Sequence, residues 1–467
     1  MDNRKCKGVI NFFVNYTSIF SLTPWRNSIR LLHEAGYTVR VYQFADERIG
    51  THPTALEDAY TLVEIHYPII AKYALFIIKT FFRSLRHVGL RRLSSIGDGI
   101  DFLLRNYYYI AACLLKNASG ENEVFIGGDP GSLVAAHYLA TKKRGTLVYW
   151  SLELYIEKNL DHFGARLLKK AERRCNRDAL CTVDFGEIRC QILREENHLD
   201  PATMISIPNS QVGPGKIARN HFFNDIFNIP KDKVLVLHAG GLFGPWYHME
   251  DIFSSIAEWP ENYILIIHTH KRPYPLCGFS IPDEYLNRKV FLSEEPVAFD
   301  QLDTLYSSCD IGIILQGPID RGVKDNLYYS DLSIGKMFHH LKVGVPIIIR
   351  DLPGFQELIA GTRAGVCVEG ASDILPAIRK ILEHHEGYKI NALKLHEEFR
   401  FELHHNKLLE RLDSLSTEKQ TVMERHGLPI EPKAEEPTDA ASIADAAPAS
   451  APAPDDGAGQ GRRGVLE

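Results

Sequence analysis

The chain has 467 residues, enough for two or three domains with large cores. Its 45% apolar and 24% charged residues are the proportions of a soluble globular protein, and the net charge of −6 argues against general nucleic-acid binding. The eight cysteines are scattered without a C-x-x-C pair, which favours reduced cytoplasmic thiols over a disulfide framework or a zinc site.

The beginning of the chain lacks the apolar run of a signal peptide. Nowhere does the sequence contain the roughly eighteen consecutive uncharged apolar residues that a membrane span requires. We therefore expect a cytoplasmic protein without a transmembrane helix.

Short apolar runs alternate with helical patterns through the first 210 residues, which predicts a parallel sheet covered by helices. Residues 8–14 are predicted to form the first strand and residues 39–43 the second, with a helix over 25–35 between them. Later apolar runs predict strands at 124–127, 147–150, 179–183 and 205–207.

Residues 66–96 combine apolar side chains at helical spacing with six Lys and Arg residues. A basic amphipathic helix of this kind can lie on an anionic membrane, so our hypothesis is that this segment makes peripheral membrane contact. A helix that packs against the core and exposes its basic edge is the alternative explanation.

Two carboxylates follow predicted strands of the first domain. Asp129 comes directly after the strand at 124–127, and Glu153 follows the strand at 147–150. Because the carboxyl ends of parallel strands share one edge of the sheet, either carboxylate could orient a bound hydroxyl group or take its proton. An N-cap is the alternative role for Asp129, and a surface ion pair is the alternative for Glu153.

The second half of the chain begins with a polar connection over 211–232 and then a strand at 234–237. Gly240 and Gly241 follow that strand and would let the backbone approach a phosphate group. The next strand, at 264–267, is followed by His268 and His270. Together with His339 and His340 these histidines could hold a metal, but no carboxylate stands at companion spacing, and we expect no metal site.

The segment from 310 to 350 is the most informative part of the sequence. It predicts a strand at 311–315, a long polar loop, a helix capped by Ser333 with Lys336 in its first turn, and a strand at 345–349. A helix start beside strand ends, with a lysine, favours phosphate binding.

The sequence SIGKMFHHLKVGVPIII followed by RDLPGFQELI resembles the donor-binding half of GT-B glycosyltransferases of the retaining, family-4-like kind. The resemblance implies an α/β fold of two Rossmann-like domains facing a cleft. It divides the chain into an acceptor-binding domain (1–210), a hinge (211–232), a donor-binding domain (233–387), a crossing helix (388–417) and a disordered tail (418–467).

The same resemblance assigns roles to individual residues. Ser333 and Lys336 match the donor diphosphate site, and Asp129 and Glu153 match acceptor-side positions. Asp331 and Glu357 match acidic positions of the donor side, and His339 stands where the family has a glutamate that holds the ribose. The family places a basic residue near the Gly-Gly turn, and here we infer that Lys271 or Arg272 supplies that charge from the neighbouring loop.

The resemblance further implies a metal-independent, retaining transfer of a sugar from a nucleotide-diphosphate sugar to a glycan or lipid-linked acceptor, without a cofactor. Two alternatives remain at this stage. One is a non-catalytic nucleotide-binding partner subunit of a glycosyltransferase, and the other is a sugar-nucleotide epimerase on the same fold.

Overall fold

We describe the protein from a computed structural model. It describes residues 6–15, 23–44, 59–66, 73, 77, 80–82, 84, 91–116, 119–242, 244–269, 281, 283–320 and 323–425. Residues 1–414 form one compact unit and residues 415–467 a second, and the following sections concern the first unit.

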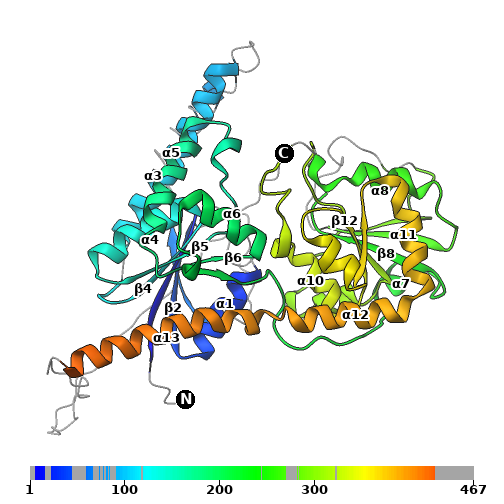
Figure 1. Ribbon diagram of the computed structural model, residues 1–467. Helices are drawn as coiled ribbons and strands as arrows, with labels where there is room; N and C mark the ends of the chain where they lie inside the picture. Colours follow the sequence, from blue (N-terminus) through cyan, green and yellow to red (C-terminus); the bar gives the residue numbers. More distant parts are fainter. Residues whose placement is uncertain are drawn as a thin grey trace, which may run out of the picture. The chain divides into compact units, whose positions relative to one another are not determined.

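The first sheet has seven parallel strands in the order β3-β2-β1-β4-β5-β6-β7 (Figure 1). The strands are β1 (Gly8–Val14), β2 (Tyr37–Phe44), β3 (Thr61–Ile65), β4 (Val124–Gly128), β5 (Thr146–Trp150), β6 (Cys181–Asp184) and β7 (Met204–Ser206). The central strands β4, β5 and β6 are largely buried, as the continuous apolar runs of a sheet covered on both faces predict.

The second sheet has six parallel strands in the order β10-β9-β8-β11-β12-β13. They are β8 (Val234–Ala239), β9 (Tyr263–His268), β10 (Val290–Ser293), β11 (Ile311–Ile314), β12 (Ile347–Arg350) and β13 (Gly365–Val368). In both sheets the order reverses beside the first strand of the half, which is where open parallel sheets bind ligands beyond their carboxyl ends.

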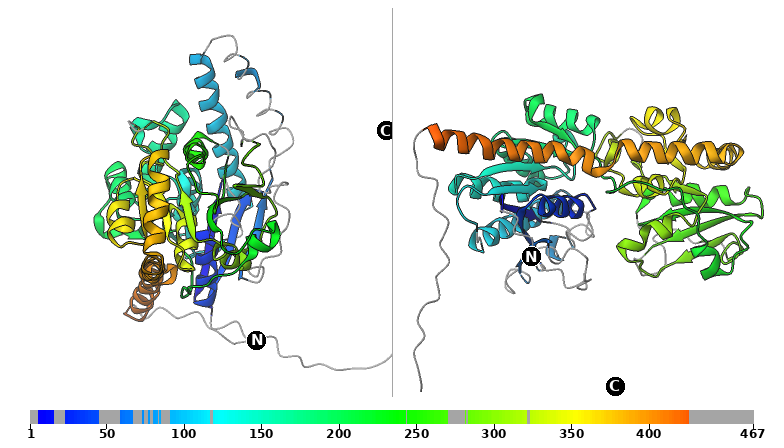
Figure 2. Two further views of the ribbon diagram at one scale, coloured as in Figure 1. Left: turned by 90° about the vertical axis from the view of Figure 1, so that its right-hand side faces the viewer. Right: turned by 90° about the horizontal axis from the view of Figure 1, so that it is seen from below.

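Helices cover both faces of each sheet (Figures 1 and 2). Those of the first half are α1 (Thr23–Glu34), α3 (Arg91–Leu115), α4 (Asp129–Lys142), α5 (Phe163–Asn176) and α6 (Glu187–Asn197). Those of the second half are α7 (Phe222–Phe227), α8 (Met249–Ile256), α9 (Leu302–Tyr306), α10 (Gly335–Lys342), the π-helical turn Gln356–Gly361, α11 (Ala371–Glu383), α12 (His385–Glu398) and α13 (Phe401–Arg425).

The last helix returns to the first sheet. Phe401, Leu408 and Leu412 of α13 are buried in the same apolar cluster as Trp25 and Ile29 of α1. Preceding it, α12 packs against α10 of the second half. The helical run after residue 385 therefore joins the two sheets of the first unit.

Several boundaries differ from those predicted. The sequence missed β3 and β13, both short and interrupted by polar or partly exposed positions. The single helix expected at 388–415 is two helices separated at residues 399–400, and α13 continues to Arg425, beyond the predicted start of the tail at 418. The rest of the predicted tail lies outside the described residues.

Candidate functional site

A cavity of about 470 Å³ lies at the carboxyl ends of β8 and β11. Its lining combines Thr23 and Arg26 of α1 with residues of the second half, among them Gly240, Tyr247, Lys336 and His339. Two lysine or arginine side chains line this cavity and no carboxylate does, as far as the described residues go. An unbalanced positive lining of this kind favours an anionic ligand.

Lys336 is the second residue of α10, and its ammonium group has no hydrogen-bond or ion-pair partner among the described residues. The Nζ atom lies 5.0 Å from the centre of the Tyr247 ring. Burial lowers the pKa of Lys336 to about 8 because the charged form is poorly solvated. An anion bound in the cavity would supply the missing partner.

Gly240 lets the backbone approach this lysine. Its φ of +122° suits only glycine, and a Cβ atom there would lie 3.8 Å from the Nζ atom of Lys336. The N–H group of Gly240 donates to the carbonyl of His268 (2.9 Å), so this amide is already used within the protein. A Cβ atom at Gly241 would lie 2.5 Å from the Tyr247 hydroxyl. Because they lack side chains, Gly240 and Gly241 leave space beside Lys336 and Tyr247 in the cavity.

The prediction that Ser333 caps the helix is wrong. Helix α10 begins at Gly335 with Ile334 in the N-cap position and no side-chain cap. The hydroxyl of Ser333 instead donates to the carbonyl of Ser330, within the short 3-10 turn Asp331–Ser333. This local hydrogen bond competes with capping, and the helix starts one residue later than a Ser333 cap would place it. Ser333 still lines the cavity.

His339 lies one helical turn beyond Lys336 and lines the same cavity. It stacks on Tyr306 with ring centres 4.8 Å apart, and burial lowers its pKa to about 4, so the ring is neutral at pH 7. The amide of Gln211 donates to its Nε2 atom (3.1 Å). The buried Nδ1 atom therefore carries the hydrogen and has no partner in the described structure.

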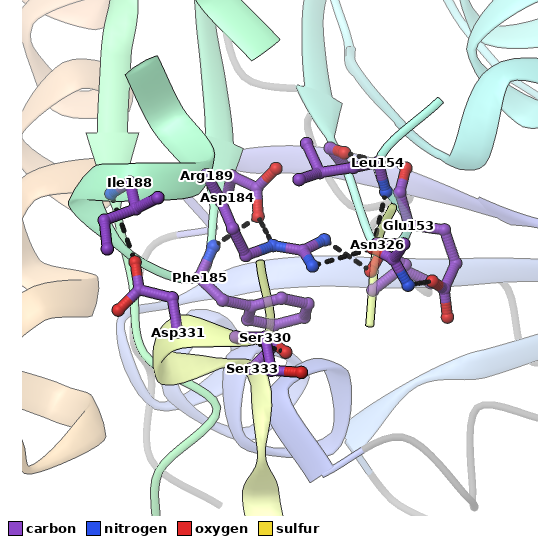
Figure 3. Close-up of polar contacts among 12 residues, drawn as sticks. Glu153, Leu154, Asp184, Phe185, Ile188, Arg189, Asn326, Ser330, Asp331 and Ser333 are labelled. Atoms are coloured by element: carbon purple, nitrogen blue, oxygen red, sulfur yellow. Dashed lines mark hydrogen bonds and ion pairs between the residues drawn. The ribbon is translucent and has the colours of Figure 1, made fainter. Parts of the chain in front are cut away.

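A polar network joins the loop after β11 to the first half (Figure 3). Asn326 accepts hydrogen bonds from the N–H of Leu154 (2.9 Å) and from Arg189 (2.8 Å), and its amide donates to the carboxylate of Glu153. Arg189 is itself buried and donates to Asp184 (2.6 Å). Glu153 is thus held by a loop of the other half, a contact that sequence patterns gave no means to predict.

Asp331 does not line the cavity and makes a separate contact with the first half (Figure 3). Its carboxylate accepts the N–H of Ile188 (3.1 Å), and its φ of +43° is unusual for a residue other than glycine. A Cβ atom at Gly186 would lie 2.0 Å from the Asp331 carboxylate, so a larger residue there would displace that side chain. Burial raises the pKa of Asp331.

Asp129 is buried, and its side chain turns back onto the start of α4. It accepts hydrogen bonds from the N–H groups of Gly131 (2.9 Å) and Ser132 (3.1 Å) and from the Ser132 hydroxyl (3.2 Å). Burial raises its pKa to about 7, although these donors favour the charged form. The arrangement matches the capping role that the sequence left open.

The remaining predicted residues lie elsewhere. Glu357 lines a separate hollow of about 570 Å³ together with Ile188, Tyr328 and Gly354. Lys271 and Arg272 fall outside the described residues. The structure thus brings Gly240, Gly241, Ser333, Lys336 and His339 together at one cavity and separates Asp129, Glu153, Asp331 and Glu357 from it.

Within the described ranges, no group of three or more His, Cys, Asp or Glu residues is arranged to hold a metal ion. Among the same residues, no helix combines the length and apolar character needed to cross a membrane.

No family model and no curated protein sequence matches this chain. Solved structures do match its fold. Sucrose-phosphate synthase from Thermosynechococcus elongatus has a TM-score of 0.59 at 13% identity, over 87% of this chain and 100% of that one. The Anabaena protein HepE, in complex with UDP-glucose, has a TM-score of 0.56 at 12% identity, over 87% and 100%.

A third similar structure is α,α-trehalose 6-phosphate synthase from Burkholderia multivorans, with a TM-score of 0.58 at 10% identity over 88% of this chain and 99% of that one. At such identities the similarity concerns the fold. The predicted fold class is confirmed, because the chain has two parallel α/β sheets arranged as in GT-B proteins.

Proposed function

We propose that this protein is a glycosyltransferase that moves a sugar from a nucleotide-diphosphate sugar to a glycan or lipid-linked acceptor. The observation that carries the proposal is Lys336, which has no hydrogen-bond or ion-pair partner among the described residues and lines a cavity that no described carboxylate lines. The cavity lies at the carboxyl ends of β8 and β11, beside the start of α10, where a diphosphate would meet positive potential.

The same arrangement suits the chemistry of glycosyl transfer. As the bond between the anomeric carbon and the β-phosphate oxygen breaks, negative charge develops on the departing diphosphate. The ammonium group of Lys336 and the start of α10 would stabilise that charge, while the acceptor oxygen bonds to the anomeric carbon and its proton passes to a base, either an acceptor-side carboxylate or the departing phosphate oxygen. A cation already in place supplies this stabilisation without reorganisation during the reaction.

For the acceptor side we propose Glu153 ahead of Asp129. Glu153 is exposed after β5, and its one hydrogen bond in Figure 3 comes from a loop of the other half. Asp129 has a pKa near 7, a suitable value for a general base, but it is buried and accepts three hydrogen bonds from α4. Release of Asn326 would free Glu153 to meet an acceptor hydroxyl.

We also propose that the transfer is metal-independent and retains the anomeric configuration. Side-chain and helix charge at the cavity support the first point, and the resemblance of residues 310–358 supports the second. Turnover that is unchanged in excess EDTA is the expected result, and the anomeric signal of the product by NMR decides the stereochemistry.

Lys336→Ala tests the main proposal. HepE was solved with UDP-glucose, which makes UDP-glucose the first donor to try. With the active donor found by screening UDP-sugars and other sugar nucleotides, we expect the variant to lose about two orders of magnitude in turnover, as when one transition-state donor is removed. Lys394→Ala, an exposed lysine of α12, is the matched control. Equal turnover in both variants would refute the role of Lys336.

A non-catalytic nucleotide-binding subunit is the second candidate. It is favoured by the observation that both candidate catalytic carboxylates are engaged within the protein, Glu153 by Asn326 and Asp129 by α4. This candidate would be supported if the protein binds a nucleotide but shows no sugar transfer, no hydrolysis of the donor and no conversion of the free donor. Reversible conversion of the free donor would instead indicate an epimerase.

We further propose peripheral contact with the inner face of an anionic membrane. Tyr73, Ile77 and Phe81 stand at intervals of four, are each in helical conformation, and are 65%, 64% and 57% exposed. The surrounding sequence is rich in Lys and Arg. Co-sedimentation with phosphatidylserine vesicles should fall when the three residues are replaced by serine, and full recovery of wild-type protein in the supernatant at low salt would refute the contact.

A further inference from the structure

Arg26 is a second cation at the candidate site, and it comes from the other half of the molecule. It belongs to the first turn of α1, whereas Lys336 belongs to α10, and both side chains line the 470 Å³ cavity. Arg26 also lines an adjoining cavity of about 270 Å³ with His339 and Phe299. Its position at the boundary of the two cavities makes it accessible to a ligand in either.

No described residue neutralises Arg26. Its guanidinium carbon lies 3.5 Å from the centre of the Phe299 ring, and its buried Nε atom has no hydrogen-bond partner. Burial and the neighbouring Arg30 both lower the pKa of Arg26 from its ordinary value. A guanidinium group has five donors, so leaving it partly buried without an acceptor costs free energy that a bound anion would recover.

His339 provides an independent sign of a missing ligand. Its side chain is buried, with 8% of the residue exposed, and it lines both cavities. Its Nδ1 atom lacks a hydrogen-bond partner among the described residues. Lys336, Arg26 and His339 therefore line one cavity, and each has a donor without a hydrogen-bond partner among the described residues. No carboxylate is among the described residues that line the larger cavity, and Asp300 and Asp303 line the smaller one, which favours an anionic ligand as the partner of these groups in the larger cavity.

We propose that Arg26 binds the diphosphate of the nucleotide ligand from the first half, so that the anion bridges α1 and α10. This inference rests on the proposed function, because it assumes that the cavity holds a nucleoside diphosphate. Arg26 of α1 would then supply a second positive charge beside Lys336, a charge that the turn after β8 does not provide. Binding of the diphosphate would also draw the two halves together, since each contributes one cation.

The test compares three ligands that differ only in phosphate content: UDP, UMP and uridine, or the corresponding series of whichever base binds. For Arg26→Gln we expect the Kd for the diphosphate to rise about tenfold or more, because a charge-assisted contact is lost. The Kd for the nucleoside should change less than about twofold, since no phosphate contact is involved. Arg26→Lys should fall between wild type and Arg26→Gln because a point charge remains.

Arg30→Gln is the matched control. Arg30 lies one turn along α1 and forms an ion pair with Glu34 (3.8 Å). It lines the smaller cavity but not the larger one. Its substitution should leave the preference for diphosphate over nucleoside unchanged. Equal weakening of diphosphate and nucleoside by Arg26→Gln, or no weakening of either, would overturn the assignment. Failure of wild-type protein to bind any nucleotide would instead overturn the proposed function together with it.

Discussion

Lys336 shows how one unpaired charge sets the behaviour of the whole site. Its pKa is lowered to about 8 by burial, from 10.5 for a solvated lysine. In the free protein the ammonium form is therefore lost as the pH rises through 8, whereas a bound diphosphate favours that form. Binding above pH 8 must then be accompanied by proton uptake.

This linkage predicts a pH-dependent nucleotide affinity. Between pH 7 and 8 the Kd for the nucleoside diphosphate should change little, and above pH 8 it should rise toward about tenfold per pH unit, as for uptake of one proton. Isothermal titration in two buffers of different ionisation enthalpy would measure both the Kd and the proton uptake.

Lys336→Arg is the control for this prediction, because arginine keeps its charge throughout the range. Its affinity should be lower or higher than that of wild type but constant with pH. A wild-type Kd that stays constant from pH 7 to 9.5 would show that Lys336 does not contact the ligand.

At the scale of single residues, the sequence identified only some of the residues that line the cavity. Lys336 and Gly240 were predicted because each stands at a fixed place after a strand or in a helix start. Asp331 was placed with them because it matches an acidic donor-side position of the family that the sequence resembles. The structure instead puts Asp331 in a left-handed conformation that turns it toward Ile188. Arg26 escaped prediction because nothing in α1 indicates which residue of the distant second half it faces.

Among the structural elements, the loop between β11 and α10 connects the two halves through hydrogen bonds. Asn326 in this loop makes three hydrogen bonds to the first half, with Leu154, Arg189 and Glu153. The carbonyl of Lys324 also accepts a hydrogen bond from Asn159 (2.7 Å). Because α10 follows directly, any movement at Lys336 is connected through this loop to Glu153.

Asn326→Ala should therefore destabilise the protein. The substitution leaves the buried Arg189 with an unsatisfied donor, at a cost of about 1–3 kcal/mol in the free energy of unfolding. Urea denaturation measures this change. Asn406→Ala, at an exposed position of α13, is the control and should be nearly neutral. Equal stability of the two variants would show that the network does not hold the halves together.

For the molecule as a whole, the sequence predicted the two-sheet architecture because most buried strands are continuous apolar runs. Strand β1 was placed with both ends correct, and β8 and β11 to within two residues. Strand β3 was missed because its buried and exposed positions do not form such a run. Contacts between the halves could not be predicted, since their partners are separated by more than a hundred residues, as Glu153 and Asn326 are.

Leu408→Ala should test how far the first sheet depends on α13. Leu408 is fully buried in the cluster that contains Trp25 and Ile29. Loss of its side chain should cost about 2–5 kcal/mol, measured as the free energy of unfolding. Leu403→Ala on the same helix is the control, because Leu403 is 45% exposed and should contribute little. Similar losses in both variants would indicate a helix-propensity effect rather than packing.

The return of α13 to the first sheet has a consequence for how the protein acquires its structure during translation. Strand β1 leaves the ribosome well before α13, yet the apolar surface around it is covered by Phe401, Leu408 and Leu412, which are made almost four hundred residues later. At about 5–20 residues per second the nascent chain must wait tens of seconds for that cover. During this interval the second half can complete its own core first, so the first half, although it is synthesised before the second, should be the later of the two to mature.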